Sequence, residues 1–320
     1  MKMERGRKAK MGRRQTVKIE RRRRRRERKE KMARKFMIGP EEIKERHALL
    51  RIKYYQALTK SEGFDVTAAP FSINPVRAHY CDDGCPDLVF LYSRIGLHRY
   101  NFLQGKKLQL SSVKKYTKPS CSHVNTYCIT LEAEDPDICG SLQTFQTKVS
   151  EQRFRRFDLK CSIARPLGET NKTITGGYSF DKSPKVLEFP QENPFVEDGG
   201  TNRFYLLKDS ELQDNDWIRL YLELAVATSN KKIGRDTHSL DSLKILKVAM
   251  ESTQGLCDFD AVFYIRYEDS CEARVGKDVH RVAIVRRILD KQSELLSLYG
   301  YNQSINKSAS VEACSSFAQD

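Results

Sequence analysis

The most distinctive chemistry in this chain is a run of six arginines, Arg21–Arg26, near the amino terminus. Guanidinium groups bind phosphates and carboxylates, so such a run can contact nucleic acid, acidic proteins or an import receptor. Like charges one helical turn apart cost about 0.2–0.5 kcal/mol per pair, and we expect a frayed arm that becomes helical when anions neutralise it. Import or anion binding is assigned to Arg21, Arg22, Arg23, Arg24, Arg25, Arg26, Arg28 and Lys29.

The positive charge is confined to one part of the chain. The 320 residues carry a formal net charge of +15, but residues 1–60 hold 24 Lys and Arg against 7 Asp and Glu, a net of +17, which leaves −2 for the remainder. We therefore expect a nearly neutral globular part attached to a basic arm. Any contact of the arm with nucleic acid should be independent of sequence and sensitive to salt.

Acidic side chains at corresponding places in two similar segments are the first candidates for acid–base chemistry. Glu132, Glu134 and Asp135 end one segment, and Glu268 and Asp269 end the other. Paired carboxylates can exchange protons with a substrate, but these flank turns, which favours solvated strand ends. The chain has no G-x-S-x-G motif, no cysteine in a protease context and no G-x-x-x-x-G-K-[ST] phosphate loop. We predict that the protein is not an enzyme.

Cysteine and histidine side chains gather at His79, Cys81 and Cys85, and again at Cys121 and His123. These are zinc-ligand types, but paired C-x-x-C spacing is missing, so we expect no metal and no cofactor. The nine cysteines are odd in number, and the amino terminus lacks the apolar segment of a signal peptide, which favours free thiols in a reducing compartment. No apolar run approaches the roughly 20 residues that span a membrane.

A repeated strand organises the rest of the chain. Val124–Asp135 and Ala261–Asp269 both alternate apolar and polar residues, which is typical of a half-buried strand. Similar apolar residues flank both copies at spacings that agree within one residue, so we predict two related sheet-forming units. Strands are expected at Lys107–Tyr116, Asn125–Asp135, Leu142–Glu151, Arg203–Lys208, Ser242–Ser252, Ala261–Ser270 and Asp278–Asp290, with an edge strand at Cys161–Arg165.

Proline, acidic and glycine residues mark the ends of three expected helices, at residues 39–62, Pro86–Gly105 and Trp217–Thr228. The first is amphipathic and either packs on the first unit or forms a short coiled coil with a partner. The third is apolar over much of its circumference and should be buried. Between the first two helices, Gly63–Pro86 is rich in proline and glycine and is expected to be a loop.

Three segments of the chain resemble plant cystatins: L-E-L-A-V-A-T-S-N-K-K at Leu222–Lys232, L-K-I-L-K-V-A at Leu243–Ala249 and Y-C-I-T-L-E-A at Tyr127–Ala133. The resemblance implies a cystatin-like fold that occurs twice. The Q-x-V-x-G hairpin with which cystatins enter a protease cleft has no match at the corresponding positions, Thr117–Val124 and Ser252–Phe259.

A second resemblance covers most of residues 60–300 and is to the crucifer-expanded plant family named after Male Sterility Five. It rests on four blocks in the same order: G-L-H-R-Y-N-F-L-Q-G at Gly96–Gly105, Y-C-I-T-L-E-A-E-D-P at Tyr127–Pro136, F-Q-T-K-V at Phe145–Val149 and L-Q-D-N-D-W-I-R-L-Y-L-E-L-A at Leu212–Ala225. Members are largely uncharacterised, and the family's namesake is associated with early meiosis. The family supplies no catalytic residues.

We therefore expect an α+β protein of two cystatin-like units, each a helix packed on an antiparallel sheet, preceded by a basic helical or disordered arm. The expected segments are the arm at 1–38, the amphipathic helix at 39–62, the first unit at 63–165, a linker at 166–202, the second unit at 203–300 and a loose tail at 301–320.

The expected function is that of a non-enzymatic nuclear interaction protein required for reproductive development, in early meiosis. Its arm serves nuclear import or binds acidic partners, with non-specific nucleic-acid contact as a further role, and its sheets form a protein-binding scaffold. No membrane contact is expected. The alternative is a cysteine-protease inhibitor of the cystatin type.

Overall fold

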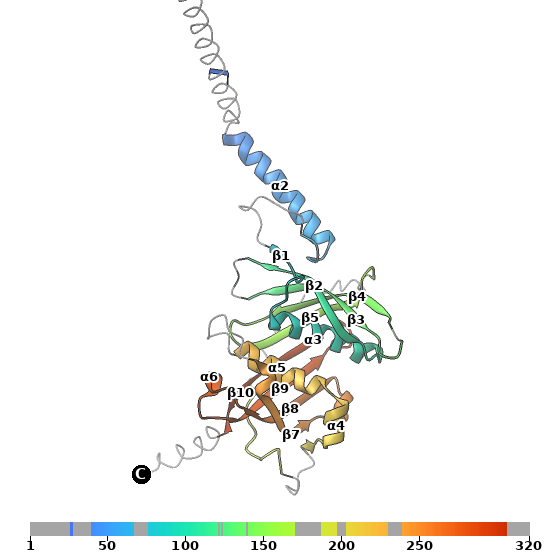
Figure 1. Ribbon diagram of the computed structural model, residues 1–320, viewed down its shortest axis with the longest axis vertical. Coiled ribbons are helices and arrows are strands. Elements are labelled where there is room, and N and C mark those ends of the chain that lie inside the picture. The colour runs from blue at the N-terminus through green and yellow to red at the C-terminus, as the bar shows by residue number, and fades with distance from the viewer. Residues whose placement is uncertain are drawn as a thin grey trace, which may run out of the picture. The chain divides into compact units, whose positions relative to one another are not determined.

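The computed structural model describes residues 26–27, 40–66, 76–120, 122, 124–138, 140–169, 187–196, 203–229 and 239–305. The chain divides into two compact units, residues 1–57 with 69–73 and residues 58–68 with 74–320. Helix α2 (Pro40–Lys60), most of which belongs to the first unit, begins at the proline from which it was predicted (Figure 1). No helix in the described ranges is both long and apolar enough to cross a membrane.

The second unit is built on one sheet of ten strands, in the order β1-β2-β3-β4-β5-β10-β9-β8-β7-β6. From each edge of the sheet to its centre the strands follow one another in chain order, from β1 to β5 on one side and from β6 to β10 on the other. Strands β5 and β10 pair antiparallel at the centre. The sheet therefore has an internal two-fold pattern in which β1–β5 correspond to β6–β10. The strands are β1 (Val76–Tyr80), β2 (Gln109–Pro119), β3 (Thr126–Glu134), β4 (Leu142–Glu151), β5 (Phe157–Pro166), β6 (Tyr205–Leu206), β7 (Leu243–Glu251), β8 (Asp260–Asp269), β9 (His280–Leu289) and β10 (Leu296–Ser304).

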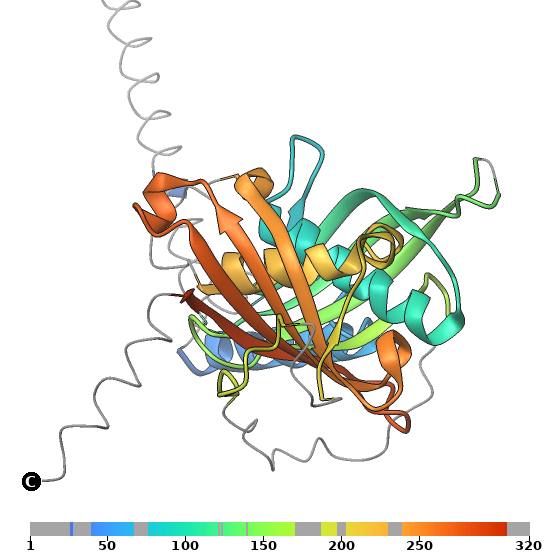
Figure 2. The ribbon, with the colours of Figure 1, turned by 90° about the horizontal axis from the view of Figure 1, so that it is seen from below.

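Helices α3 (Asp87–Gln104) and α5 (Trp217–Ser229) pack against each other and cover the same face of the sheet (Figure 2). Helix α3 contacts β2 to β5, and α5 contacts β5, β9 and β10. Apolar side chains from both halves form one continuous buried cluster, which includes Ile95, Ile129, Leu222, Phe263 and Val285. Because burial of apolar area is the main favourable term in folding, this shared core joins the two halves into one body.

Two glycines set the position of α3. The helix ends at Gly105, whose φ of 63° is the left-handed conformation that terminates helices and that glycine adopts without strain. Gly96 faces β4, where a Cβ atom would overlap with the side chain of Thr147. The absence of a side chain at Gly96 therefore lets the helix lie close to the sheet.

The opposite face of the sheet is covered in part by irregular segments. Phe64, which follows α2 in the chain, packs with Cys128 and Ile163 in the first half. In the second half Phe195 packs against Tyr264 and other residues of β7 to β9. Short connections complete the unit: helices α4 (Asp209–Asp214) and α6 (Glu272–Val275), and the single-turn 3-10 helices η1 (Leu240–Ser242) and η2 (Gly255–Cys257).

The predicted combination of helices with an antiparallel sheet is confirmed, and β4 coincides with its predicted range. Three predictions were wrong. The loop predicted at Gly63–Pro86 contains β1, and Cys161–Arg165 is part of a longer strand at the centre of the sheet, where it was predicted at an edge. Strand β10 was not predicted, and it continues past the expected boundary at residue 300.

The missed strand has a physical explanation. The sequence of β10, L-S-L-Y-G-Y-N-Q-S, contains glycine and several polar residues that weaken the strand signal. It is held by hydrogen bonding to β5 on one side and β9 on the other. Gly300 is required there because a Cβ atom would overlap with the carbonyl oxygen of Ile284.

Candidate functional site

The basic residues predicted to bind anions lie mostly outside the described part of the chain. Arg21–Arg25, Arg28 and Lys29 are outside the described residues. Arg26 lies in a described helical pair, residues 26–27, and is exposed. The role of the arm therefore stays a prediction.

The strand-end carboxylates differ between the two halves. Glu132 on β3 is partly exposed, and the Lys114 ammonium at 2.9 Å and the Ser112 hydroxyl at 2.9 Å lower its pKa. Asp269 ends β8 and has a side-chain exposure of only 1%. The prediction of a solvated strand end was therefore wrong for Asp269, because Arg274 of α6 folds over it.

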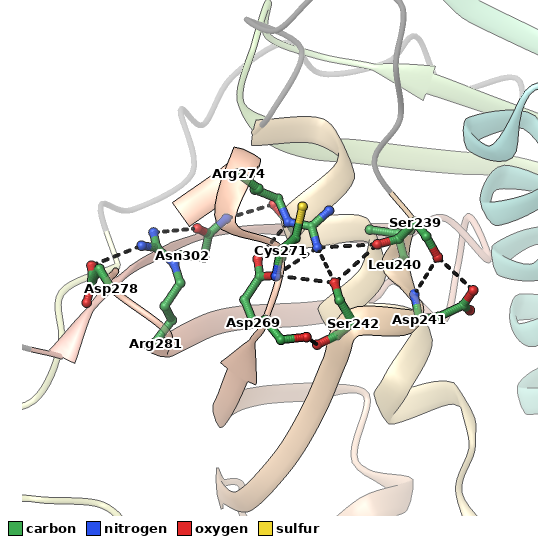
Figure 3. Close-up of polar contacts among 12 residues, drawn as sticks. Ser239, Leu240, Asp241, Ser242, Asp269, Cys271, Arg274, Asp278, Arg281 and Asn302 are labelled. Carbon is green, nitrogen blue, oxygen red and sulfur yellow. Dashed lines mark hydrogen bonds and ion pairs between the residues drawn. The ribbon is translucent and has the colours of Figure 1, made fainter. Parts of the chain in front are cut away.

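Asp269 is the centre of a polar cluster at the ends of β7 and β8 (Figure 3). Arg274 Nε donates to Asp269 Oδ2 at 2.6 Å, and Arg274 Nη2 donates to Oδ1 at 2.9 Å and to Ser242 Oγ at 2.7 Å. The Cys271 N–H donates to Oδ1 at 3.0 Å. Burial by itself raises the pKa of Asp269, but the hydrogen bonds from Arg274 and Cys271 lower it overall. The cluster holds β7, β8 and α6 together, and both carboxylate oxygens of Asp269 accept hydrogen bonds within it.

A second polar chain in the same view joins β9, β10 and α5 (Figure 3). Asp278 accepts hydrogen bonds from Arg281 Nη1 at 3.2 Å and Ser304 Oγ at 2.9 Å. Arg281 Nη2 donates to Asn302 Oδ1 at 3.1 Å, and Asn302 Nδ2 donates to the carbonyl of Ala225 at 3.0 Å. These bonds fix the end of β10 against α5.

The described cysteines are free thiols and include Cys81 and Cys85, which interact with each other on the connection between β1 and α3. Burial and the neighbouring Cys81 raise the pKa of Cys85. His79 stacks on the ring of Tyr116, with 4.8 Å between centroids. Within the described ranges no three His, Cys, Asp or Glu side chains are placed to hold a metal ion, and Cys121 and His123 lie outside those ranges.

One charged residue is buried beneath the helices at the equivalent place in each half. Tyr127 pairs with Val149 as Phe263 pairs with Val285, so Glu151 of β4 corresponds to Arg287 of β9. The Tyr92 hydroxyl of α3 donates to Glu151 Oε1 at 2.8 Å, and burial raises the pKa of Tyr92. The two halves thus carry opposite charges at one position of the repeat.

Arg287 is fully buried among aromatic rings. Its guanidinium carbon lies 4.7, 5.1 and 5.3 Å from the ring centroids of Phe102, Trp217 and Phe263. Its Nη2 donates to the carbonyls of Leu256 and Asp258 at 2.7 and 2.6 Å, while Nε and Nη1 donate to no acceptor in the described part of the chain. Cation–π contacts of this kind stabilise a desolvated charge.

His98 lies beside this arginine. It stacks on Trp217 at 5.2 Å, and its Nε2 is 2.9 Å from the Tyr221 hydroxyl. Burial, and then the charge of Arg287, lower the pKa of His98 to about 3. The histidine is therefore neutral at physiological pH and forms part of the core.

A pocket of about 280 Å³ lies where the β4–β5 turn meets β10 and the end of α5. We call it the turn pocket. Its polar lining comes from Arg153, Arg155, Arg156, Asp158, Ser229, Tyr299 and Tyr301.

The charges of the turn pocket are predominantly positive. Arg153 Nε lies 3.3 Å from Asp158 Oδ2, and burial raises the pKa of that carboxyl although Arg153 and Lys160 oppose the shift. Arg155 and Arg156 are exposed, and no carboxylate of the described residues forms an ion pair with either of them. Sequence reasoning missed this feature, although the R-F-R-R run between two predicted β segments is a visible signal.

Arg287 was also missed. It occupies a core-facing position in the alternation of β9, two residues after Val285 and two before Leu289. A charged residue at a core position of a strand is a signal of a buried polar contact, but the sequence does not indicate which rings and carbonyls surround it.

The chain is similar to plant proteins over most of its length. The model of the family described as Protein MS5 matches residues 186–298. UPF0725 protein EMB2204 of Arabidopsis thaliana is 38% identical over 258 residues, which cover 75% of this chain and 77% of that protein. UPF0725 protein At1g02770 of the same plant is 36% identical over 264 residues, which cover 77% and 81%.

A solved structure agrees with these similarities. The crystal structure of MS5 from Brassica napus matches with a TM-score of 0.55 and 30% identity, and the match covers 69% of this chain and 99% of that one. The resemblance inferred from the four sequence blocks is therefore confirmed, and the chain belongs to the MS5 family of plant proteins.

Proposed function

We propose that this MS5-family protein is a non-enzymatic interaction protein that acts in the nucleus during reproductive development, in early meiosis. The observation that carries the proposal is the separation of charge: the first 60 residues have a net charge of +17, and the remaining residues have −2. A strongly basic segment next to a nearly neutral fold is suited to an import receptor or an acidic partner. The family relationship supports the link with male sterility.

The ten-stranded body supports a scaffold role. Its halves share one core, so surfaces on the two halves keep a constant relation to each other. Buried carboxylates such as Asp269 and Glu151 are engaged by tyrosine or arginine donors within the fold. These polar clusters therefore stabilise the fold itself, which fits a protein with a binding function.

Replacement of Arg21–Arg26 by glutamine tests the proposal. The full chain, fused to a tag too large to diffuse passively through nuclear pores, should be nuclear, and the glutamine variant should be mainly cytoplasmic. A matched control replaces the exposed lysines Lys244, Lys247 and Lys277 by glutamine and should stay nuclear. Nuclear accumulation of the arginine variant would contradict the role of the arm, and absence of the protein from meiotic cells of anthers would contradict the developmental role.

A cystatin-type inhibitor is the second candidate, because in each half a long helix lies in the chain between the first strand and four further antiparallel strands, and the cystatin resemblance implies a helix packed on an antiparallel sheet. The geometry of the β7–β8 connection argues against it. This connection is tied to the core by Arg287, and Asp258 within it accepts hydrogen bonds from Ser252 and Thr253. Titration of papain with the purified protein distinguishes the two functions, and submicromolar inhibition would favour the inhibitor.

A further inference from the structure

We propose that the turn pocket binds a phosphorylated serine or threonine side chain of a partner protein. The proposal concerns a folded site that is separate from the basic arm, and it goes beyond the general interaction function proposed above. At about 280 Å³ the pocket is large enough for one phosphorylated side chain and too small for a folded element.

The charge of the site matches a dianion better than a single carboxylate. Arg155 and Arg156 project from the turn without a carboxylate partner in the described residues, and Arg153 shares its charge with Asp158. A phosphomonoester carries about −1.5 to −2 charges at neutral pH and forms charge-assisted hydrogen bonds to arginine clusters. Two guanidinium groups that form no ion pair within the described residues are therefore complementary to one phosphate.

Tyrosine side chains add neutral donors. Tyr299 and Tyr301 both line the turn pocket, and a tyrosine hydroxyl can donate its hydrogen to an acceptor. Burial raises the pKa of both tyrosines, so they stay protonated and act as donors at neutral pH.

The backbone of the turn points to a role for the arginine side chain itself. Arg155 has a φ of 56°, the left-handed conformation in which glycine is unstrained and other residues are not. Its guanidinium lies 4.8 Å from the ring centroid of Phe154, whose side chain is 47% exposed. Leu187 lines the pocket and Phe154 lies beside Arg155, and this apolar surface favours a peptide over free phosphate as the ligand.

Because of the backbone conformation of Arg155, one substitution can remove its guanidinium without straining the turn. Arg155→Gly removes the guanidinium and relieves the strained φ, so the fold should be retained, which thermal unfolding would verify. Arg156→Gln is a second variant of similar size to the original. In fluorescence anisotropy, a labelled peptide Gly-Ser-Gly-pSer-Gly-Ser-Gly should bind the full chain, and each variant should weaken binding by about tenfold or more, the effect of one charge-assisted contact.

Two further variants sharpen the test. Asp158→Asn removes the carboxylate that competes for Arg153 and should tighten binding of the phosphopeptide. Lys106→Glu, an exposed lysine after α3 and outside the pocket lining, should change affinity by less than about twofold, as expected of a distant screened charge. The unphosphorylated peptide should bind at least tenfold more weakly than the phosphopeptide in the full chain.

The arm also attracts anions, so the same titration is repeated on a full-length chain in which Arg21–Arg26 are replaced by glutamine. Phosphopeptide binding that vanishes in that chain and is unchanged by Arg155→Gly and Arg156→Gln would overturn the pocket proposal and leave the function of the arm intact. Equal affinity for inorganic phosphate and the phosphopeptide would overturn a peptide ligand. If the original chain binds the phosphopeptide but does not enter the nucleus, only the function proposed for the arm is contradicted.

Discussion

Breaking the buried ion pair between Asp269 and Arg274 is expected to destabilise the second unit strongly. The side chains are 1% and 4% exposed, and two hydrogen bonds of 2.6 and 2.9 Å join them. Removing one member of a buried pair leaves the other charge uncompensated, which costs about 3–5 kcal/mol. Asp269→Asn keeps an oxygen that can accept from Cys271, so we expect a loss near the lower limit, about 3 kcal/mol. Arg274→Met also leaves Ser242 without its donor, and we expect a loss of about 4 kcal/mol.

Urea unfolding measures these losses. The only tryptophan, Trp217, packs against the buried core of the second unit, so its fluorescence reports the transition. The double variant Asp269→Asn/Arg274→Met should lose less than the sum of the single losses, by about 2 kcal/mol, because no uncompensated charge remains. Additive losses, or a loss below about 1 kcal/mol for Asp269→Asn, would refute the reasoning.

The pH dependence of stability gives an independent check. The pKa of Asp269 is lowered in the folded protein, whereas an unfolded aspartate has a pKa of about 3.9. The stabilisation is therefore complete above the unfolded value and is lost as the pH falls toward the folded one. Asp269→Asn should show a smaller loss of stability between about pH 5 and about pH 3 than the original chain, and identical pH profiles would contradict the shift.

Substitutions at three other positions test the shared core. Arg287→Ala should lower the free energy of unfolding by about 3–5 kcal/mol, because it opens a cavity and removes the donor to Leu256 and Asp258. Arg287→Met fills more of the space and should cost less in the same urea titration. A larger loss for the methionine variant than for the alanine variant would contradict the packing argument. Gly300→Ala forces a methyl group against the carbonyl of Ile284 and should lower Tm sharply or abolish soluble expression; a Tm within about 2 °C of the original would show that β9 and β10 can separate locally. The folded pKa of His98 is about 3 and the unfolded value is about 6.5, so stability should fall as pH decreases from about 6.5. His98→Gln should reduce that slope, and an unchanged slope would contradict the shift.

Most of the fold could be predicted from local sequence patterns. Alternation of apolar and polar residues identified β3, β4, β8 and β9 within about three residues, because a half-buried strand needs one apolar face whatever its partners are. Pro86 and Gly105 marked the ends of α3 because their backbone preferences act locally. The strands that were missed or misplaced, β1, β5 and β10, depend on their neighbours in the sheet.

The candidate site was less predictable. The sequence indicated the arginine-rich arm, whereas the turn pocket needs β4, β5 and β10 to meet, and β10 begins 140 residues after the β4–β5 turn ends. Asp269 was predicted to be a solvated strand end, and its pairing with Arg274 was missed, because exposure depends on where α6 folds. Neither feature is a property of one segment.

By itself, the sequence determined the repeat, the alternating strands, the helix ends, the separation of charge and the family, since these are properties of neighbouring residues or of ordered motifs. The tertiary structure alone decided that the two repeats share one sheet through β5 and β10, that Arg287 and Glu151 are buried at equivalent positions, and that the arginines of the β4–β5 turn line a pocket. The physical reason is that burial and charge pairing depend on residues distant in sequence, and the chain brings these together only when the whole core has formed.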